Sequence, residues 1–242
     1  MAFRDGWDSS ALLGGYNITS WVRGAEVNRE MDVNERTGWG NGGSRAYRAG
    51  LVTGTVSFEI FDDEGDGVGV DGIAEILRSL VRSTGTPLTI GHETPVVGGP
   101  TTLCAVIPTG IGPSADFESI REGSLEVQAS DGIEDGVWLK TLAAETASTT
   151  SSSVDNTAAT TGGYVVHQHV TAKSGTTPTL VTTIEHSTDN VTFATLVELA
   201  SVNAVGSTRV VGTGTVNRYR RRKSTIAGTN PSFTHAVTLA TW

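Results

Sequence analysis

Hydrophobic and polar residues alternate along much of the chain, a pattern typical of β-strands with one buried face. The clearest alternation lies in the segment Leu51–Phe61, and a second lies in Ala25–Val33. Each segment carries one set of polar alternate positions: Glu26, Asn28 and Glu30 in the earlier segment, and Thr55, Ser57 and Glu59 in the later one. The sequence therefore predicts two strands that each present a polar face.

One segment, Asp71–Ser83, has the periodicity of an amphipathic helix, and Asp71 is suited to cap its N-terminus. Its apolar stripe consists of Ile73, Ile76, Leu77, Leu80 and Val81. Further strands are predicted at Pro87–Ile90, Thr101–Ile107, Ser124–Ala129 and Val137–Leu142. The glycine-rich run Arg36–Tyr47 is predicted to be a long loop. Antiparallel strands with one helix indicate a small sandwich or barrel with a helix packed on it.

Residues 143–163 consist largely of Ser, Thr and Ala and lack large apolar side chains, which predicts a flexible linker. Six short strands separated by turn residues follow, and this spacing indicates a β-sandwich. The predicted strands are Tyr164–Ala172, Thr179–His186, Thr195–Ala200, Thr208–Gly212, Arg218–Ile226 and Thr234–Ala240. The expected fold class is mainly β, with domains at residues 1–142 and 164–242.

Composition agrees with a β-rich protein, since only 18% of the 242 residues are charged and 30 are glycine. There is no run of 18 apolar residues that could span a membrane, and the first ten residues do not resemble a signal peptide. The single cysteine, Cys104, lies in an apolar run and is expected to be buried without a disulfide. These features predict a soluble protein of a reducing compartment.

Charge is distributed unevenly between the two parts of the chain. Residues 1–142 carry 10 Lys and Arg against 21 Asp and Glu, a net charge of −11, whereas residues 143–242 have a net charge of +2. Nucleic-acid binding by neutralising phosphates needs clustered Lys and Arg. The acidic part therefore argues against such binding, but it is compatible with a surface past which nucleic acid moves without adhering.

The segment Asp62–Gly72 carries two patterns that resemble binding motifs. Its G-x-G-x-x-G run follows a strand and precedes a helix, as in dinucleotide-binding sites, but the surrounding carboxylates would repel a pyrophosphate. Asp62, Glu64 and Asp66 match the first positions of a calcium loop, yet Ile73 stands where the bidentate Glu belongs. We expect a solvated acidic loop and no cofactor, and whether this loop binds a divalent ion is left open.

His167 and His169 lie on one face of a predicted strand, and His186 ends the next strand. A structural zinc site would need four ligands, and Cys104 lies in the other predicted domain. We therefore expect exposed histidines on a sheet face and no metal site.

The run from Arg218 to Lys223 is the one basic cluster. On a strand, Arg218, Arg220 and Arg222 share one face, and Arg221 and Lys223 share the other with Tyr219. The favoured interpretation is a solvated or edge strand, on which charge blocks unwanted strand pairing. Docking onto an acidic surface is the alternative.

Two further kinds of site are compatible with the sequence. A carboxylate group from Asp131, Glu134 and Asp135 could come together in a turn, as a hydrolase would require, but a plain acidic turn explains the same residues. No G-x-S-x-G motif is present, and no catalytic residue is expected, so the protein is not predicted to be an enzyme. A glycan-binding platform could use the aromatic residues Tyr164, Phe193, Tyr219, Phe233 and Trp242.

The N-terminal residues up to Asp63 resemble the start of major tail (tube) proteins of long, non-contractile-tailed bacteriophages, the siphophages. In that family an early strand pair and a long loop lead into a glycine-bounded strand, matched here by Gly50–Asp62, and a closing strand resembles Ser124–Ala129. Later segments resemble tail proteins that carry an added C-terminal, Ig-like β-sandwich. These segments are Ile184–Phe193, Arg218–Arg221 and Gly228–Phe233.

The resemblance implies a structural virion protein whose hexameric rings stack into a tail tube, an acidic conduit for DNA ejection. It implies no cofactor, no membrane insertion, DNA only in transit, and partners that include further copies, the tape measure, the tail terminator and the baseplate or distal tail proteins. The implied location is the virion tail, after assembly in the host cytoplasm. The alternative is a carbohydrate-binding or adhesion module of a virion or bacterial surface.

The resemblance also suggests roles for particular residues. The long loop is the candidate for contact between rings, the two alternating strands are candidates for the lumen wall, and an outward-projecting C-terminal domain would carry the basic strand. The inter-ring candidates are Arg36, Trp39, Asn41, Arg45 and Tyr47; the lumen-wall candidates are Glu26, Asn28, Glu30, Thr55, Ser57 and Glu59; and the basic strand contains Arg218, Arg220, Arg221, Arg222 and Lys223.

Overall fold

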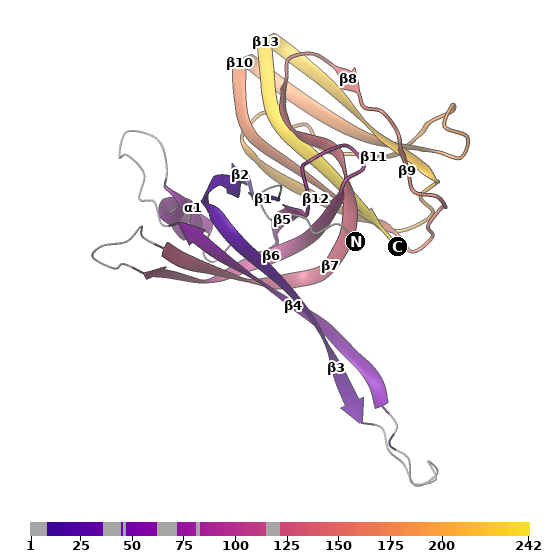
Figure 1. The fold of residues 1–242 in the computed structure, drawn as a ribbon. Helices are drawn as coiled ribbons and strands as arrows, with labels where there is room; N and C mark the ends of the chain where they lie inside the picture. The colour runs from indigo at the N-terminus through magenta and orange to yellow at the C-terminus, as the bar shows by residue number, and fades with distance from the viewer. Residues whose placement is uncertain (1–8, 36–44, 46, 62–71, 81–82, 115–121) are drawn as a thin grey trace. The chain divides into compact units, whose positions relative to one another are not determined.

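A computed structural model describes residues 9–35, 45, 47–61, 72–80, 83–114 and 122–242. The fold is mainly β, as predicted, and the described residues form thirteen strands and one α-helix (Figure 1). Every strand pair with an assigned register is antiparallel. In the described part of the chain, no helix is long and apolar enough to cross a membrane.

The chain divides into two compact units, which we call unit 1 and unit 2. Unit 1 comprises Met1–Ser20, Thr86–Cys104 and Glu134–Trp242, and unit 2 comprises Trp21–Gly85 and Ala105–Ile133. Unit 1 holds β1 (Ser10–Leu13), β2 (Tyr16–Asn17), β5 (Thr86–Gly91), β8 (Thr149–Thr150), β9 (Val154–Asp155), β10 (Tyr164–Ser187), β11 (Ala194–Glu198), β12 (Gly206–Gly212) and β13 (Tyr219–Thr241). Unit 2 holds β3 (Val22–Glu35), β4 (Tyr47–Phe61) and α1 (Ile73–Leu80), while β6 (Pro100–Ser114) and β7 (Glu122–Glu145) contribute residues to both units.

In unit 2, β4 lies between β3 and β7, and its alternating residues behave as the sequence predicts. Val56, Phe58 and Ile60 are buried, and the first two pair with the buried Val127 and Leu125 of β7. The helix is shorter than predicted, but the described apolar residues of its stripe are buried or half-buried: Ile73, Ile76, Leu77 and Leu80. The proposed cap Asp71 and the stripe residue Val81 lie outside the described residues.

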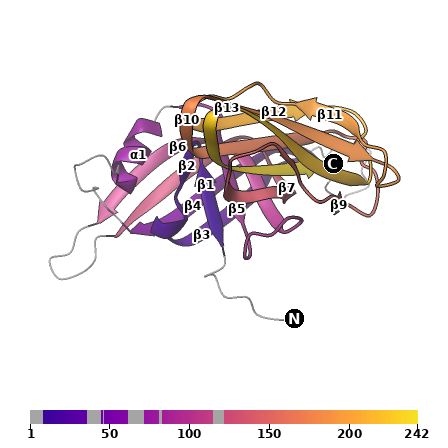
Figure 2. The ribbon, with the colours of Figure 1, turned by 90° about the horizontal axis from the view of Figure 1, so that it is seen from above.

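Unit 1 is organised around two long strands, β10 and β13, which pair from Tyr164–Thr241 to Ser187–Tyr219 (Figures 1 and 2). The sequence predicted four shorter strands here, with turns near Gly175 and Gly228. The structure instead has two continuous strands whose register shifts at these places. Gly175 and Gly228 have positive φ angles of 104° and 126°, so the turn residues are used for β-bulges opposite one another.

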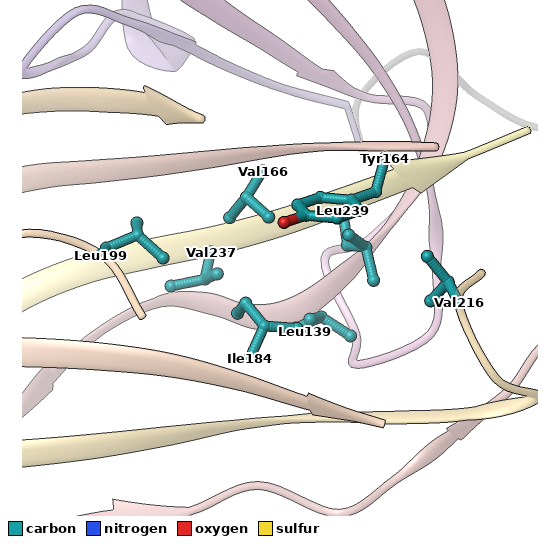
Figure 3. Packing of buried hydrophobic residues seen from close by; sticks show 8 residues of the cluster. All are labelled: Leu139, Tyr164, Val166, Ile184, Leu199, Val216, Val237 and Leu239. Atoms are coloured by element: carbon teal, nitrogen blue, oxygen red, sulfur yellow. The ribbon is translucent and has the colours of Figure 1, made fainter. Parts of the chain in front are cut away.

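The core of the C-terminal strands is aliphatic and contains one tyrosine. Figure 3 shows its eight fully or almost fully buried side chains, which come from β7, β10, β13 and the segments that follow β11 and β12. They are Leu139, Tyr164, Val166, Ile184, Leu199, Val216, Val237 and Leu239. Burial of large apolar side chains, each worth about 1.5–3 kcal/mol, stabilises this layer. Cys104 is also buried, as predicted.

The residues predicted to form a linker are part of unit 1. Residues 143–145 end β7 and pair with β13, and the short strands β8 and β9 pair with β13 as well. Ladder hydrogen bonds come from the backbone, so small polar side chains can form them without hydrophobic periodicity. The compact units are thus divided differently from the predicted domains, and a functional division at residues 142 and 164 stays a prediction.

Candidate functional site

The six lumen-wall candidates share one exposed face of the sheet in unit 2. Glu26 pairs with Ser57 and Asn28 with Thr55 across β3 and β4, and all six side chains are exposed. The pairing continues into β7, where Ser124, Glu126 and Gln128 lie opposite Glu59, Ser57 and Thr55. We call this set the polar face; it comprises Glu26, Asn28, Glu30, Thr53, Thr55, Ser57, Glu59, Ser124, Glu126 and Gln128.

The three β7 residues of the polar face were not among the sequence candidates. Ser124, Glu126 and Gln128 alternate with the buried Leu125 and Val127, so the same alternation that identified β4 could have identified them. From the sequence, this strand is expected only to close the fold and not to contribute to the polar surface. The register shows that it extends the polar surface by a third strand.

The polar face is acidic. Its ten positions include four glutamates and no lysine or arginine. Asn28 donates a hydrogen bond to Glu30 (Nδ2 to Oε1, 2.9 Å), and Gln128 donates one to the carbonyl of Gly54 (2.7 Å). Exposed like charges on neighbouring strands generate a negative surface potential that repels polyanions. An exposed ion pair lies at the margin of this face, between Arg23 and Glu122 (2.6 Å).

The distal part of the β3–β4 hairpin has no third strand beside it. Among the described residues, β4 pairs with β7 only from Thr55 onward, whereas its pairing with β3 continues to Tyr47 opposite Glu35. We call residues 29–35 and 47–54 the arm (Figure 1). Met31 and Tyr47 on the arm are 52% and 57% exposed, which is high for large apolar side chains. A two-stranded ribbon is at best marginally stable in water without further packing.

Only part of the predicted inter-ring loop can be placed. Tyr47 is the first residue of β4, and Arg45 precedes it with an exposed side chain. The candidates Arg36, Trp39 and Asn41 lie outside the described residues. The acidic loop residues Asp62, Glu64 and Asp66 lie outside them as well, so the possible calcium loop stays a prediction.

The basic strand is not the solvated or edge strand that the sequence favoured. It forms the start of β13, which pairs with β10 on one side and with β8 and β9 on the other. Arg220 and Arg222 are buried, with exposed fractions of 2% and 4%, and Lys223 is exposed. Burial lowers the pKa of Arg220 to about 10. The strand is therefore mostly internal to unit 1.

Carboxylates from distant parts of the chain neutralise three of these arginines. Arg222 makes a two-point contact with Glu145 (2.8 and 3.0 Å), and Arg218 makes another with Asp155 (2.6 and 2.7 Å). Arg221 pairs with Glu185 at 2.6 Å. These partners are more than 35 residues away or on another strand, so the local sequence gives no sign of them. Three of the five basic side chains of this run are therefore paired with carboxylates within unit 1.

The predicted exposure of His167 and His169 was wrong, because both are fully buried. His169 donates from Nδ1 to the carbonyl of Gly14 (2.7 Å), and its Nε2 lies 2.9 Å from the Thr89 hydroxyl, which also lies 3.2 Å from His167 Nδ1. Burial lowers the pKa of His169 to about 4 and that of His167 well below its usual value. In the described residues, no group of three or more His, Cys, Asp or Glu side chains could hold a metal ion.

The geometry argues against the carboxylate site and reduces the possible glycan platform. Asp131, Glu134 and Asp135 lie within the continuous strand β7 and not in a turn, so neighbouring members point to opposite faces. Tyr164 and Phe233 are buried, which removes two of the five aromatic residues from a possible glycan platform. Arg221 covers the ring of Phe193 (3.7 Å) and Arg218 that of Tyr219 (4.9 Å), and Trp242 is 45% exposed.

No protein-family model matches the sequence, and no curated protein matches it. The structure is similar to a chain from the virion of a native gene transfer agent particle, with 12% identity and a TM-score of 0.43 over 54% of this chain and 97% of that one. It is also similar to the Dit protein of phage SPP1, described as a paradigm of the hub adsorption apparatus in phages that infect Gram-positive bacteria, with 16% identity and a TM-score of 0.39 over 97% and 99%. A chain of the anti-feeding prophage baseplate gives 17% identity and a TM-score of 0.38 over 52% and 89%. TM-scores below 0.5 assign neither fold nor function.

Proposed function

We propose that this chain is a structural subunit of a phage-type tail, in which copies join side by side into rings. The observation that carries the proposal is the edge strand β3. This strand has 14 residues, and among the described residues it pairs only with β4. A long edge strand with an unpaired outer side is a template for pairing with another chain. Closure into a ring of identical subunits would pair every such edge.

The polar face supports a channel inside the ring. A sheet that closes into a barrel has one face inward, and on β4 and β7 the face opposite the polar one is buried in the core of unit 2. If the polar face is inward, its four glutamates line the channel without a compensating lysine or arginine on the same face. DNA carries dense negative charge, so such a wall lets it pass without adhering. The polar face is therefore our candidate for the lumen wall.

The arm supports stacking of one ring on the next. It carries the exposed Met31 and Tyr47 and has only two strands among the described residues, so it gains stability if it packs against another subunit. The finer proposal is a major tail protein of the siphophage type, with hexameric rings, DNA in transit, and the tape measure, tail terminator and distal tail proteins as partners. Its location would be the virion tail after assembly in the host cytoplasm. It has no catalytic role in this proposal.

The basic strand has a smaller part in this proposal than the sequence suggested. Most of its charge is paired inside unit 1, and of its two exposed members Arg218 is paired with Asp155, so Lys223 is the candidate for contact with an acidic surface.

Assembly is tested by measuring the mass of the purified full chain by light scattering over a hundredfold concentration range, with negative-stain electron microscopy of the same samples. We expect particles of several subunits with a central channel. A photo-crosslinking residue in place of Tyr47 should join subunits, whereas the same residue in place of Val191, which is 81% exposed on a turn in unit 1, should not. A monomer at every concentration that gives no crosslink from position 47 contradicts the proposal.

The channel is tested separately with the triple variant Glu26→Lys, Glu59→Lys and Glu126→Lys. The unmodified assembly should not retain DNA, and the variant should retain it with an affinity that falls as salt rises. The matched control reverses the exposed Asp135, Asp189 and Glu198 in unit 1. Equal DNA retention by both variants would show that general surface charge, and not the polar face, governs adhesion.

A further inference from the structure

Unit 1 contains a pocket of about 470 Å³ that has no part in the proposed assembly. It is formed by β1, the segment around β2, the loop after β5 and the middle of β7. None of its ten lining residues is charged, and six are Ser, Thr or Asn, among them Ser10, Asn17, Thr94 and Thr141. Its volume lies within the range of about 300–1,000 Å³ that is usual for small-molecule sites.

Two buried polar groups at this pocket have no hydrogen-bond partner among the described residues: the indole N–H of Trp138 and the hydroxyl of Ser10. Both residues line the pocket, and Trp138 is only 1% exposed. The two atoms lie 3.1 and 2.5 Å from the position that a Cβ on Gly91 would occupy. A Cβ at this position would overlap the Ser10 hydroxyl, so glycine is what allows the backbone of residue 91 to lie against both polar groups.

The unpartnered groups continue inward from Trp138 across neighbouring strands. Thr238 of β13 is the cross-strand partner of Trp138, and His167 of β10 is the partner of Thr238. The hydroxyl of Thr238 and Nε2 of His167 are also buried without a partner among the described residues. Buried polar groups in proteins are nearly always satisfied by protein, ordered water or ligand. Of this row only Trp138 lines the pocket, so its indole N–H is the group to which a bound molecule would be nearest.

We propose that this pocket binds a neutral saccharide unit, with a sugar oxygen accepting the indole N–H of Trp138. Sugar hydroxyls both donate and accept, which matches the hydroxyl and amide side chains of the lining. The apolar C–H faces of a sugar match Leu12, Pro95 and Leu142. A charged ligand would find no oppositely charged side chain in this lining, so burial of its charge would be unfavourable. The site does not depend on ring assembly.

The test is ligand-observed saturation-transfer NMR on the full chain, which tolerates large assemblies. The probes are glucose, galactose, mannose, rhamnose and N-acetylglucosamine, with glucuronate, glucosamine and N-acetylalanine amide as competitors. We expect saturable transfer to at least one neutral sugar with a dissociation constant in the millimolar range. Gly91→Ala should weaken this binding at least tenfold, because its Cβ would overlap the Ser10 hydroxyl and press on the Trp138 ring, which displaces both lining side chains.

Two further variants separate site loss from misfolding. Thr94→Trp fills the exposed mouth of the pocket and should also abolish transfer, while Gly110→Ala, whose Cβ would meet its nearest neighbour at 4.0 Å in unit 2, should leave it unchanged. The proposal is overturned if no neutral sugar gives saturable transfer, if the signal survives both pocket variants, or if a charged sugar or the amide binds more tightly.

Discussion

On the polar face of unit 2, Glu26, Glu59 and Glu126 are exposed on three adjacent strands, and none of the ten residues that define this face is a lysine or arginine. In unit 1, by contrast, Glu145 is held by Arg222, and their side chains are only 13% and 5% exposed. The exposed glutamates of the polar face can interact with other molecules at the surface. The buried pair of Glu145 and Arg222 instead joins strands β7 and β13, and removing one of these side chains leaves the other as an unpaired buried ion.

The largest effect expected from changing a charged pair comes from breaking that buried pair with Glu145→Ala. Burial raises the pKa of Glu145, but hydrogen bonds from Thr149 and Arg222 outweigh this and keep the carboxyl ionised. Its removal leaves Arg222 as an uncompensated buried charge, so the free energy of unfolding should fall by about 3–5 kcal/mol. Chemical denaturation at pH 7 and fixed protein concentration measures this. The exposed pair gives the control: Asp155→Ala should have little effect, and equal losses would contradict the distinction.

The same contrast explains which features could be predicted from the sequence. The polar face follows from alternation within β3 and β4, because a period of two fixes which residues share a face. The pairing of Arg222 with Glu145 depends on which strands become neighbours, 77 residues apart. Nothing in the local pattern of the Arg218–Lys223 run reports that. A run of basic residues is therefore equally compatible with an exposed edge strand and with a central strand whose arginines pair with distant carboxylates.

Histidine burial was missed for a related reason. His167 and His169 lie in a run of seven consecutive buried residues in β10, so this strand is covered on both faces. Alternation of polar and apolar residues identifies a strand with one buried face, whereas a strand that is buried on both faces shows no such alternation. The sequence predicts four shorter strands in place of β10 and β13, because Gly175 and Gly228 are typical turn residues but here lie in β-bulges within the long strands.

Acid should weaken unit 1 through these histidines, which sharpens the contrast with the exposed face. Burial lowers the pKa of both His169 and His235 to about 4 from 6.5. Between these values the unfolded chain binds protons that the folded chain does not, so stability is complete above pH 6.5 and falls as the pH drops towards 4. At pH 5 the loss should be about 2 kcal/mol for each histidine. Denaturation curves at pH 7, 6 and 5 measure it.

His169→Gln identifies the group responsible for part of this slope. Protonation of His169 would replace the acceptor nitrogen that faces the Thr89 hydroxyl with a donor. The variant should be less stable at pH 7 but should lose less stability between pH 7 and pH 5. An unchanged slope would exclude His169 as a source of the acid sensitivity.

Arg221→Ala tests an intermediate case, in which a charge pair is partly buried. Arg221 lies 2.6 Å from Glu185 and 3.7 Å above the ring of Phe193, with side-chain exposures of 30% for Arg221 and 12% for Glu185. A partly screened pair with a cation–π contact predicts a loss of about 1 kcal/mol, measured by thermal unfolding. Lys223→Ala on the same strand removes an exposed charge and should change stability less. A larger effect at Lys223 would contradict this ranking.

The smallest effect is expected at Glu126, and it tests the polar face most directly. Glu126→Lys reverses a charge on an exposed central position, so the free energy of unfolding should change by no more than about 0.5 kcal/mol. Leu125→Lys changes the neighbouring residue, which is fully buried on the opposite face, and should prevent stable folding of unit 2 because a buried ammonium group has no partner there. Circular dichroism and denaturation of both variants measure the difference. If Glu126→Lys proved as damaging as Leu125→Lys, the charge of this face would be needed for the subunit to fold. A tolerated reversal means that the four glutamates are free to serve a surface outside the subunit, as a channel wall requires.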